Sequence, residues 1–92
     1  MKFMVIETFK PEARQQVYAR YKAKGRMLPA GLVYLDSWVT DDGSKCFQLM
    51  ETENAGLFDQ WIEIWSDLVN FEIVPVHDSP TKTAQGCCTS TR

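Results

Sequence analysis

The sequence predicts an α+β domain of the ferredoxin-like class, with the element order βαββαβ, a four-stranded antiparallel sheet in the order 4-1-3-2, and two helices on one face. Stretches with strand-like and helix-like spacing of apolar residues follow one another in that order along the chain. One tight turn joins the middle two strands, and helical crossovers make the other two connections. Pro75 lies in the last strand and cannot donate to a ladder, so this strand belongs at a sheet edge, as the order requires.

The first part of the chain predicts a strand, a helix and a buried loop. Residues 2–9 are rich in β-branched and aromatic side chains and predict the first strand. Residues 11–24 begin with Pro-Glu, carry apolar positions three to four apart and stop before a glycine, so they predict the first helix. The next loop has two glycines and a proline around Met27 and Leu28, which we expect to point inward.

The second part predicts a hairpin, a helix and a last strand. Residues 32–40 and 45–51 are β-rich runs separated by Asp-Asp-Gly-Ser, a hairpin signal because glycine adopts positive φ at little cost. Residues 55–68 carry a broad apolar stripe whose tryptophans we expect in the core, with Asn54 as the expected N-cap, and they predict the second helix. Residues 70–76 predict the last strand.

A single domain is expected over residues 1–77, followed by a flexible C-terminal tail over residues 78–92. The chain has 92 residues, 45% of them hydrophobic, which suits one domain, whereas the tail has almost nothing to bury. The formal net charge of −2 and the lack of a basic block argue against nucleic acid as a partner. No apolar run is long enough for a signal peptide or a bilayer span, so we expect a cytoplasmic protein without membrane contacts.

Cysteine and histidine residues do not predict a metal or cofactor site. Cys46 lies in an apolar run, and Cys87 and Cys88 are adjacent in the tail, which is no disulfide framework and leaves the role of the pair open. His77 is the sole imidazole, and no spacing typical of metal ligands occurs. No metal and no cofactor are therefore expected. Arg26 either meets an anionic ligand at the sheet rim or is solvated, which is the commoner state of an arginine.

The turn of the hairpin allows two registers. A two-residue turn at Asp42-Gly43 places Asp36 opposite Leu49, whereas a three-residue loop with a glycine bulge places it opposite Gln48. We expect the second register, because it pairs a polar residue with another polar residue.

Alternation along the strands assigns their side chains to two faces. We expect the face under the helices to hold Met4, Ile6, Val33, Leu35, Val39, Phe47, Leu49, Phe71 and Ile73. The opposite face still carries Phe3, Val5 and Trp38 among others, an apolar patch larger than soluble monomers usually expose. A second copy packed sheet against sheet is the simplest cover, so we expect a homodimer through the non-helical face, a dimeric α+β barrel.

A candidate ligand pocket is expected on that non-helical face, where a partner sheet would exclude water. It consists of Glu7, Tyr34, Asp36, Trp38, Gln48 and Glu72. Burial beside Trp38 would raise a carboxyl pKa and make Asp36 or Glu7 a general base. The phenol and the amide would then orient a small ligand. The same side chains also fit plain hydrogen bonding across the dimer interface.

Four segments, MKFMVIETF, GRMLPAGLVYLDSW, CFQLMET and WSDLVNFEIVPV, together resemble a bacterial family of short domains, the domain of unknown function 3303 family, over roughly residues 1–76. In its fold the sequence also resembles the dimeric α+β barrel superfamily, which includes cofactor-independent monooxygenases, haem-degrading enzymes and small isomerases. The haem-degrading branch uses an Asn, a Trp and a His. Trp38 is available here, but the only His is at a strand end and the first three strands contain no Asn, so haem chemistry is not expected.

These observations predict a small dimeric ligand-binding or regulatory domain, because no residue set meets the geometric needs of a named reaction. The alternative is a cofactor-independent monooxygenase or isomerase acting on a small aromatic or polyketide-like substrate beside Trp38. An enclosed cavity lined by Tyr34, Asp36 and Trp38 would favour the enzyme. A face filled by side chains would favour the binding domain.

Overall fold

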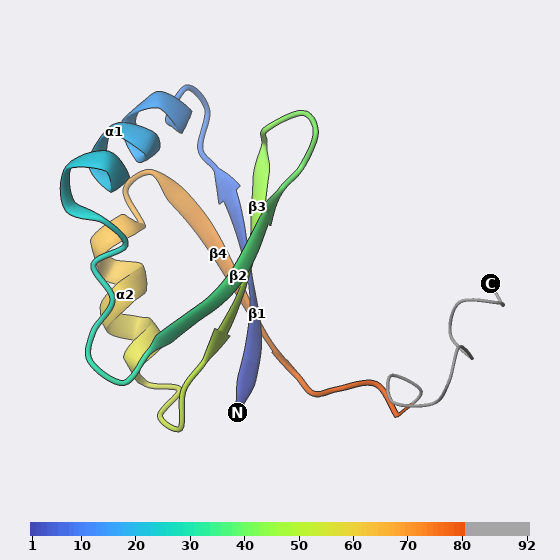
Figure 1. Cartoon of the computed structure of the whole chain (residues 1–92). Coiled ribbons are helices and arrows are strands. Elements are labelled where there is room, and N and C mark those ends of the chain that lie inside the picture. Colours follow the sequence, from blue (N-terminus) through green and yellow to red (C-terminus); the bar gives the residue numbers. More distant parts are fainter. Residues whose placement is uncertain (81–92) are drawn as a thin grey trace, which may run out of the picture.

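The structure, a computed structural model, describes residues 1–80 and contains six elements (Figure 1). They are β1 (Lys2–Phe9), α1 (Arg14–Lys24), β2 (Val33–Val39), β3 (Lys45–Glu51), α2 (Leu57–Trp65) and β4 (Val69–Val76). The antiparallel strand order β2-β3-β1-β4 is the predicted order read from the opposite edge, so the predicted ferredoxin-like fold is confirmed. Most of the predicted tail, with Cys87 and Cys88, lies outside the described residues. No helix within residues 1–80 is long and apolar enough to cross a membrane.

Both helices are shorter than predicted. α1 starts at Arg14 rather than at residue 11, because Glu12 has a positive φ of 63° that a right-handed helix does not contain. α2 likewise lies within its predicted range. Asn54 does not cap α2 as expected, since its Oδ1 accepts the N–H of Gly56 at 3.0 Å in a turn just before the helix.

The predicted register of the β2–β3 hairpin is wrong. Asp36 lies opposite Leu49, and the partner of Gln48 is Ser37. A bulge between Tyr34 and Asp36 then shifts the pairing by one residue. Residues three apart in a regular strand face opposite sides, but the bulge brings Tyr34 and Ser37 onto one face, where their hydroxyls hydrogen-bond at 2.7 Å.

The predicted faces of β1 and β3 are reversed. Phe3 and Val5, which are 6% and 0% exposed, lie under the helices. Alternation does not distinguish the two sets in β1, because both are apolar, and the buried set contains Glu7, a residue type that is usually exposed. Several residues predicted under the helices therefore lie elsewhere, namely Met4, Ile6, Val33, Leu35, Phe47 and Leu49.

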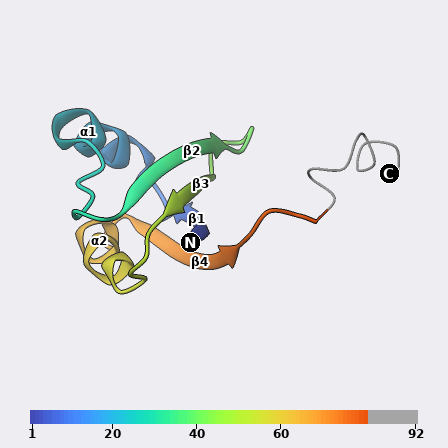
Figure 2. The same cartoon turned by 60° about the horizontal axis from the view of Figure 1, so that its bottom comes forward.

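The other face of the sheet, here called the open face, has no helix of the described residues over it (Figure 2). Its apolar side chains are Met4, Ile6, Val33, Trp38, Phe47, Leu49, Val74 and Val76. Both helices lie on the opposite face, so in the described part of the chain only one face of the sheet is covered by helices.

The core lies between the helices and the sheet, and α2 supplies its largest side chains. Trp61 is 2% exposed, and its ring packs edge-on against Phe71 of β4 with 5.4 Å between centroids. Trp61 and Trp65 both donate their Nε1–H groups to the backbone carbonyl of Arg26, at 2.9 and 3.1 Å. The predicted core position of both tryptophans is confirmed. The two residues after Arg26 are partly buried, also as predicted.

Candidate functional site

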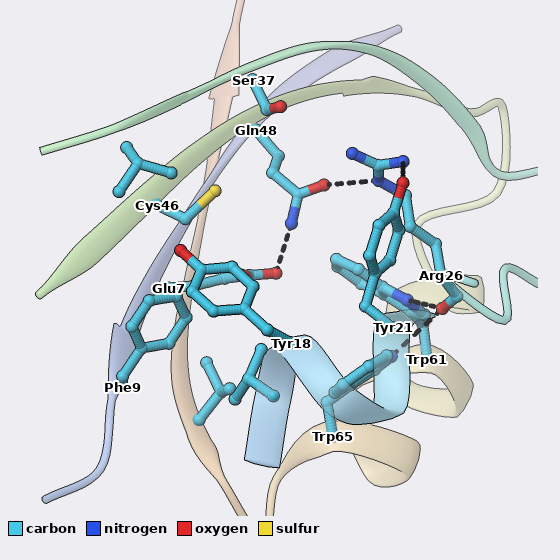
Figure 3. Close-up of a pocket in the computed structure, with 13 residues that line it drawn as sticks. Glu7, Phe9, Tyr18, Tyr21, Arg26, Ser37, Cys46, Gln48, Trp61 and Trp65 are labelled. Atoms are coloured by element: carbon cyan, nitrogen blue, oxygen red, sulfur yellow. Dashed lines mark hydrogen bonds between the residues drawn. The ribbon is translucent and has the colours of Figure 1, made fainter. Parts of the chain in front are cut away.

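A cavity of about 230 Å³ lies between the helices and the covered face of the sheet (Figure 3). Most of its wall is aromatic or aliphatic and consists of Phe9, Val17, Tyr18, Tyr21, Val39, Trp61, Trp65 and Val69. The polar side chains that reach it are Glu7, Arg26, Ser37, Cys46 and Gln48. A mainly apolar cavity with a few converging polar groups is the common form of a small-molecule site.

Three of the polar side chains hydrogen-bond in a row, which the dashed lines of Figure 3 trace. Gln48 of β3 donates through Nε2 to Oε2 of Glu7 on β1 at 2.5 Å. The Oε1 atom of Gln48 accepts from Nε of Arg26, in the loop after α1, at 3.2 Å. The carboxyl and the guanidinium therefore orient the amide between them, nitrogen toward Glu7 and oxygen toward Arg26.

Glu7 is a buried carboxyl that titrates near neutral pH. Burial raises its pKa from 4.5 to about 7, and the hydrogen bond from Gln48 and the charge of Arg26 lower it only in part. The residue is 8% exposed, so little water reaches the carboxylate. A carboxyl with a pKa near 7 exists in both protonation states at neutral pH and can either accept or donate a proton.

Arg26 is not the solvated arginine that its loop position made the commoner expectation. Its guanidinium lies over the ring of Tyr34, 3.7 Å from the centroid, and 5.1 Å from the ring centroid of Tyr21. Its Nη1 atom donates to the Tyr21 hydroxyl at 3.3 Å. Aromatic faces attract a cation, so the contacts with the two rings compensate for part of the hydration that the guanidinium loses on burial.

The structure separates the six residues of the predicted pocket. The three that meet at or beside the cavity, on the helix-covered face, are Glu7, Gln48 and Tyr34. The three that lie on the open face are Asp36, Trp38 and Glu72. The predicted non-helical location is therefore wrong for half of the set, and the structure does not bring all six together.

The residues that the sequence reasoning missed belong mainly to α1 and the loop after it. Tyr18 and Tyr21 stand three apart on α1 and both reach the cavity. Arg26 follows Gly25 (φ 70°) and precedes Met27 (φ 58°), and the backbone carbonyl of Arg26 meets two indoles of α2. This pattern indicates a fixed loop, but the strand residues that it meets depend on how α1 packs over the sheet.

Cys46 lines the cavity as a neutral thiol. Burial and the charge of Glu7 raise the pKa of the thiol to about 11, so the thiolate that acts as a nucleophile is not formed at neutral pH. No three His, Cys, Asp or Glu side chains gather closely enough to hold a metal ion within residues 1–80. The one acidic and the one basic side chain that line the cavity are the carboxyl of Glu7 and the guanidinium of Arg26.

The comparison with protein families finds a match over most of the chain. The family described as Domain of unknown function (DUF3303) matches residues 1–85. No curated protein matches the chain. The family match covers every element of the sheet and both helices, and it agrees with the resemblance that the four sequence segments indicate.

Proposed function

The chain belongs to the family described as domain of unknown function (DUF3303), and we propose that it binds a small aromatic molecule in the cavity between the helices and the sheet. The observation that carries this proposal is an aromatic and aliphatic cavity on which a carboxyl, an amide and a guanidinium converge. Removing a ring from water provides affinity, and the polar row orients it. The site lies within one chain rather than between two sheets.

The size of the cavity restricts the ligand. An apolar cavity of about 150 Å³ holds one benzene molecule. The space of about 230 Å³ therefore fits a single aromatic ring with one or two small substituents better than a larger polyketide-like molecule. Tyr18, Tyr21 and Trp65 supply aromatic rings in the cavity wall against which such a ring can pack.

Binding can be tested with a neutral probe and a variant that fills the cavity. We expect benzyl alcohol at about ten times its Kd to add about 1.4 kcal/mol of stability, which raises Tm by several degrees. In Cys46→Phe the new ring occupies the cavity and should abolish the shift. Lys45→Phe adds the same ring to the neighbouring residue, whose side chain points to the other face, and should keep it. Equal shifts in both variants would contradict binding in this cavity.

A second candidate function, a cofactor-independent isomerase or monooxygenase, is favoured by one observation. Glu7 has a pKa of about 7 inside the cavity, so it could remove a proton from a bound aromatic substrate. Proton removal is the step in which such a reaction needs a protein base. Glu7→Gln separates the two candidates, because it keeps the size of the cavity and removes the group that exchanges a proton. A binding domain should still bind its ligand in this variant, whereas an enzyme should bind its substrate and no longer convert it.

We also propose that a second copy covers the open face. Val33 and Trp38 are each 51% exposed there, and a large exposed apolar patch favours association. A two-fold axis packs the same patch of each copy against the other, so the two open faces would bury their apolar side chains together.

The dimer has a direct test. Sedimentation velocity at micromolar concentration should report twice the chain mass of 10.6 kDa. Trp38→Asp places a charge in the patch and should give the single-chain mass. Ile64→Asp, on the exposed side of α2, should remain dimeric. A single-chain mass for the unchanged protein would refute the dimer.

A further inference from the structure

We propose that the ligand of the cavity is an anion, a small aromatic carboxylate whose carboxylate group pairs with Arg26. The inference rests on the proposed function, since it specifies the class of molecule that the same cavity binds. It starts from the hydrogen-bonding capacity that Arg26 has left after its contacts with the protein.

Within residues 1–80, the guanidinium of Arg26 has unused donors and no ion pair with a carboxylate. Of its five N–H groups, one meets the Gln48 amide and one the Tyr21 hydroxyl. Among residues 1–80, no carboxylate forms an ion pair with it. Arg20 shows the contrast, because Asp67 accepts two of its N–H groups at 2.9 and 2.7 Å. Arg26 is thus a partly buried cation held by neutral groups, and its remaining donors suit the two oxygens of a carboxylate.

The position of Arg26 is fixed at both ends of the residue. Its carbonyl oxygen accepts the indole N–H groups of Trp61 and Trp65. Its guanidinium is held over the ring of Tyr34 and beside Tyr21. A long side chain that is already ordered loses little conformational entropy when a ligand binds, so the ordering of Arg26 does not weaken the affinity.

The groups around the cavity leave Arg26 as its dominant charge. Glu7 is the acid that faces it, through the Gln48 amide, and burial keeps that carboxyl partly protonated near neutral pH. β3 adds the neutral thiol of Cys46, and α1 adds the phenols of Tyr18 and Tyr21. β2, β4 and α2 present Ser37, Val39, Val69 and two tryptophans, none of which is charged. A bound anion therefore meets one cation and at most one partly ionised acid.

Arg26 and the apolar wall together define the ligand class. Figure 3 shows Arg26 at one side of the cavity, with Phe9 and Tyr18 toward the other. A molecule that pairs its carboxylate with the guanidinium can therefore extend its ring into the aromatic part. The volume of about 230 Å³ allows one ring and the acid group, as in benzoate or phenylacetate.

The test compares benzoate with benzamide, which has nearly the same shape and no charge, by NMR titration at pH 6. We expect the unchanged protein to bind benzoate at least about tenfold more tightly than benzamide. Arg26→Gln should bind both about equally, and its retained affinity for benzamide would show that the cavity is intact. Lys24→Gln removes the same unit of charge from an exposed position at the end of α1 and should keep the preference.

Each contrary result identifies which proposal fails. Equal binding of both probes by the unchanged protein would overturn the anion site and leave the aromatic cavity standing. A benzoate preference that survives in Arg26→Gln would also overturn it, because the anion would then sit elsewhere. Binding of neither probe would refute the proposed function together with this inference. The Nε–H resonance of Arg26 gives a readout without any variant, since benzoate should move it and benzamide should not.

Discussion

Trp61→Ala is expected to lower the free energy of unfolding by about 3–5 kcal/mol, the range for truncating a large buried aromatic side chain. The indole is almost wholly buried and packs against Phe58 and Phe71. Its loss leaves a space that the surrounding core cannot close completely, and it removes one of the two donors that hold the Arg26 carbonyl. Small domains have little stability to spare, so a large share of the variant should be unfolded at 37 °C.

Urea unfolding followed by circular dichroism measures this loss of stability, and two further variants serve as controls. Ile64→Ala shortens an exposed apolar side chain of the same helix and should cost less than about 1 kcal/mol. Trp61→Phe keeps most of the packing and should cost less than Trp61→Ala, because Trp65 still donates to Arg26. A cost below about 1 kcal/mol for Trp61→Ala would contradict a core centred on this residue.

The elements and their order could be predicted because each signal is local. Lys2–Phe9 and Lys45–Glu51 have their predicted bounds, since runs of β-branched and aromatic residues end at turns. The edge position of β4 followed from Pro75 alone, through the missing backbone donor. In these cases a few neighbouring residues contain the physical cause, so no knowledge of the packing is needed.

The faces and the register could not be predicted, because they depend on packing between distant residues. The bulge after Tyr34 changes which side chains of β2 share a face, and no glycine marks it in the sequence. In β1 the apolar character of both faces hides the fact that Glu7 points under the helices. A rule that places charged residues outside fails for a residue that a glutamine partner and a nearby cation support.

Only part of the candidate site could be predicted from the sequence, because the rest also depends on packing between distant residues. Glu7 and Gln48 stand out in the sequence as polar residues within apolar strands, and the structure places both at the cavity, on the helix-covered face rather than on the predicted one. Arg26 was judged by its own loop, whereas its state is set by Tyr34 and Gln48, which follow it in the chain, and by two tryptophans of α2. The contacts of Arg26 can be recognised only when it is known how α1 and α2 pack on the same face of the sheet.

Glu7→Gln is expected to remove a pH dependence of stability worth about 3 kcal/mol. The pKa of Glu7 is about 7 in the folded chain against 4.5 for an unperturbed glutamate, and each unit of difference corresponds to about 1.36 kcal/mol. Below pH 4.5 both folded and unfolded chains carry the protonated form, so burial has no ionic cost. As the pH rises from about 4.5 to 7, the unfolded chain ionises first, and the folded state loses stability. Above pH 7 the full penalty applies.

The measurement is the difference in unfolding free energy between variant and unchanged protein, from urea curves at pH 4.5 to 8.5. Glu7→Gln should gain about 3 kcal/mol on the unchanged protein across this window, because its amide does not ionise. Asp42, whose pKa its hydrogen bonds with Ser44 and Thr40 lower to about 2, is present in both proteins, so its acid titration cancels in the difference. Glu63→Gln removes a carboxylate from an exposed position on α2, away from the open face, and is the matched control for the loss of one acidic side chain. Parallel pH profiles for Glu7→Gln and the unchanged protein would mean that the carboxyl of Glu7 reaches water, and that its pKa is not raised toward neutral pH.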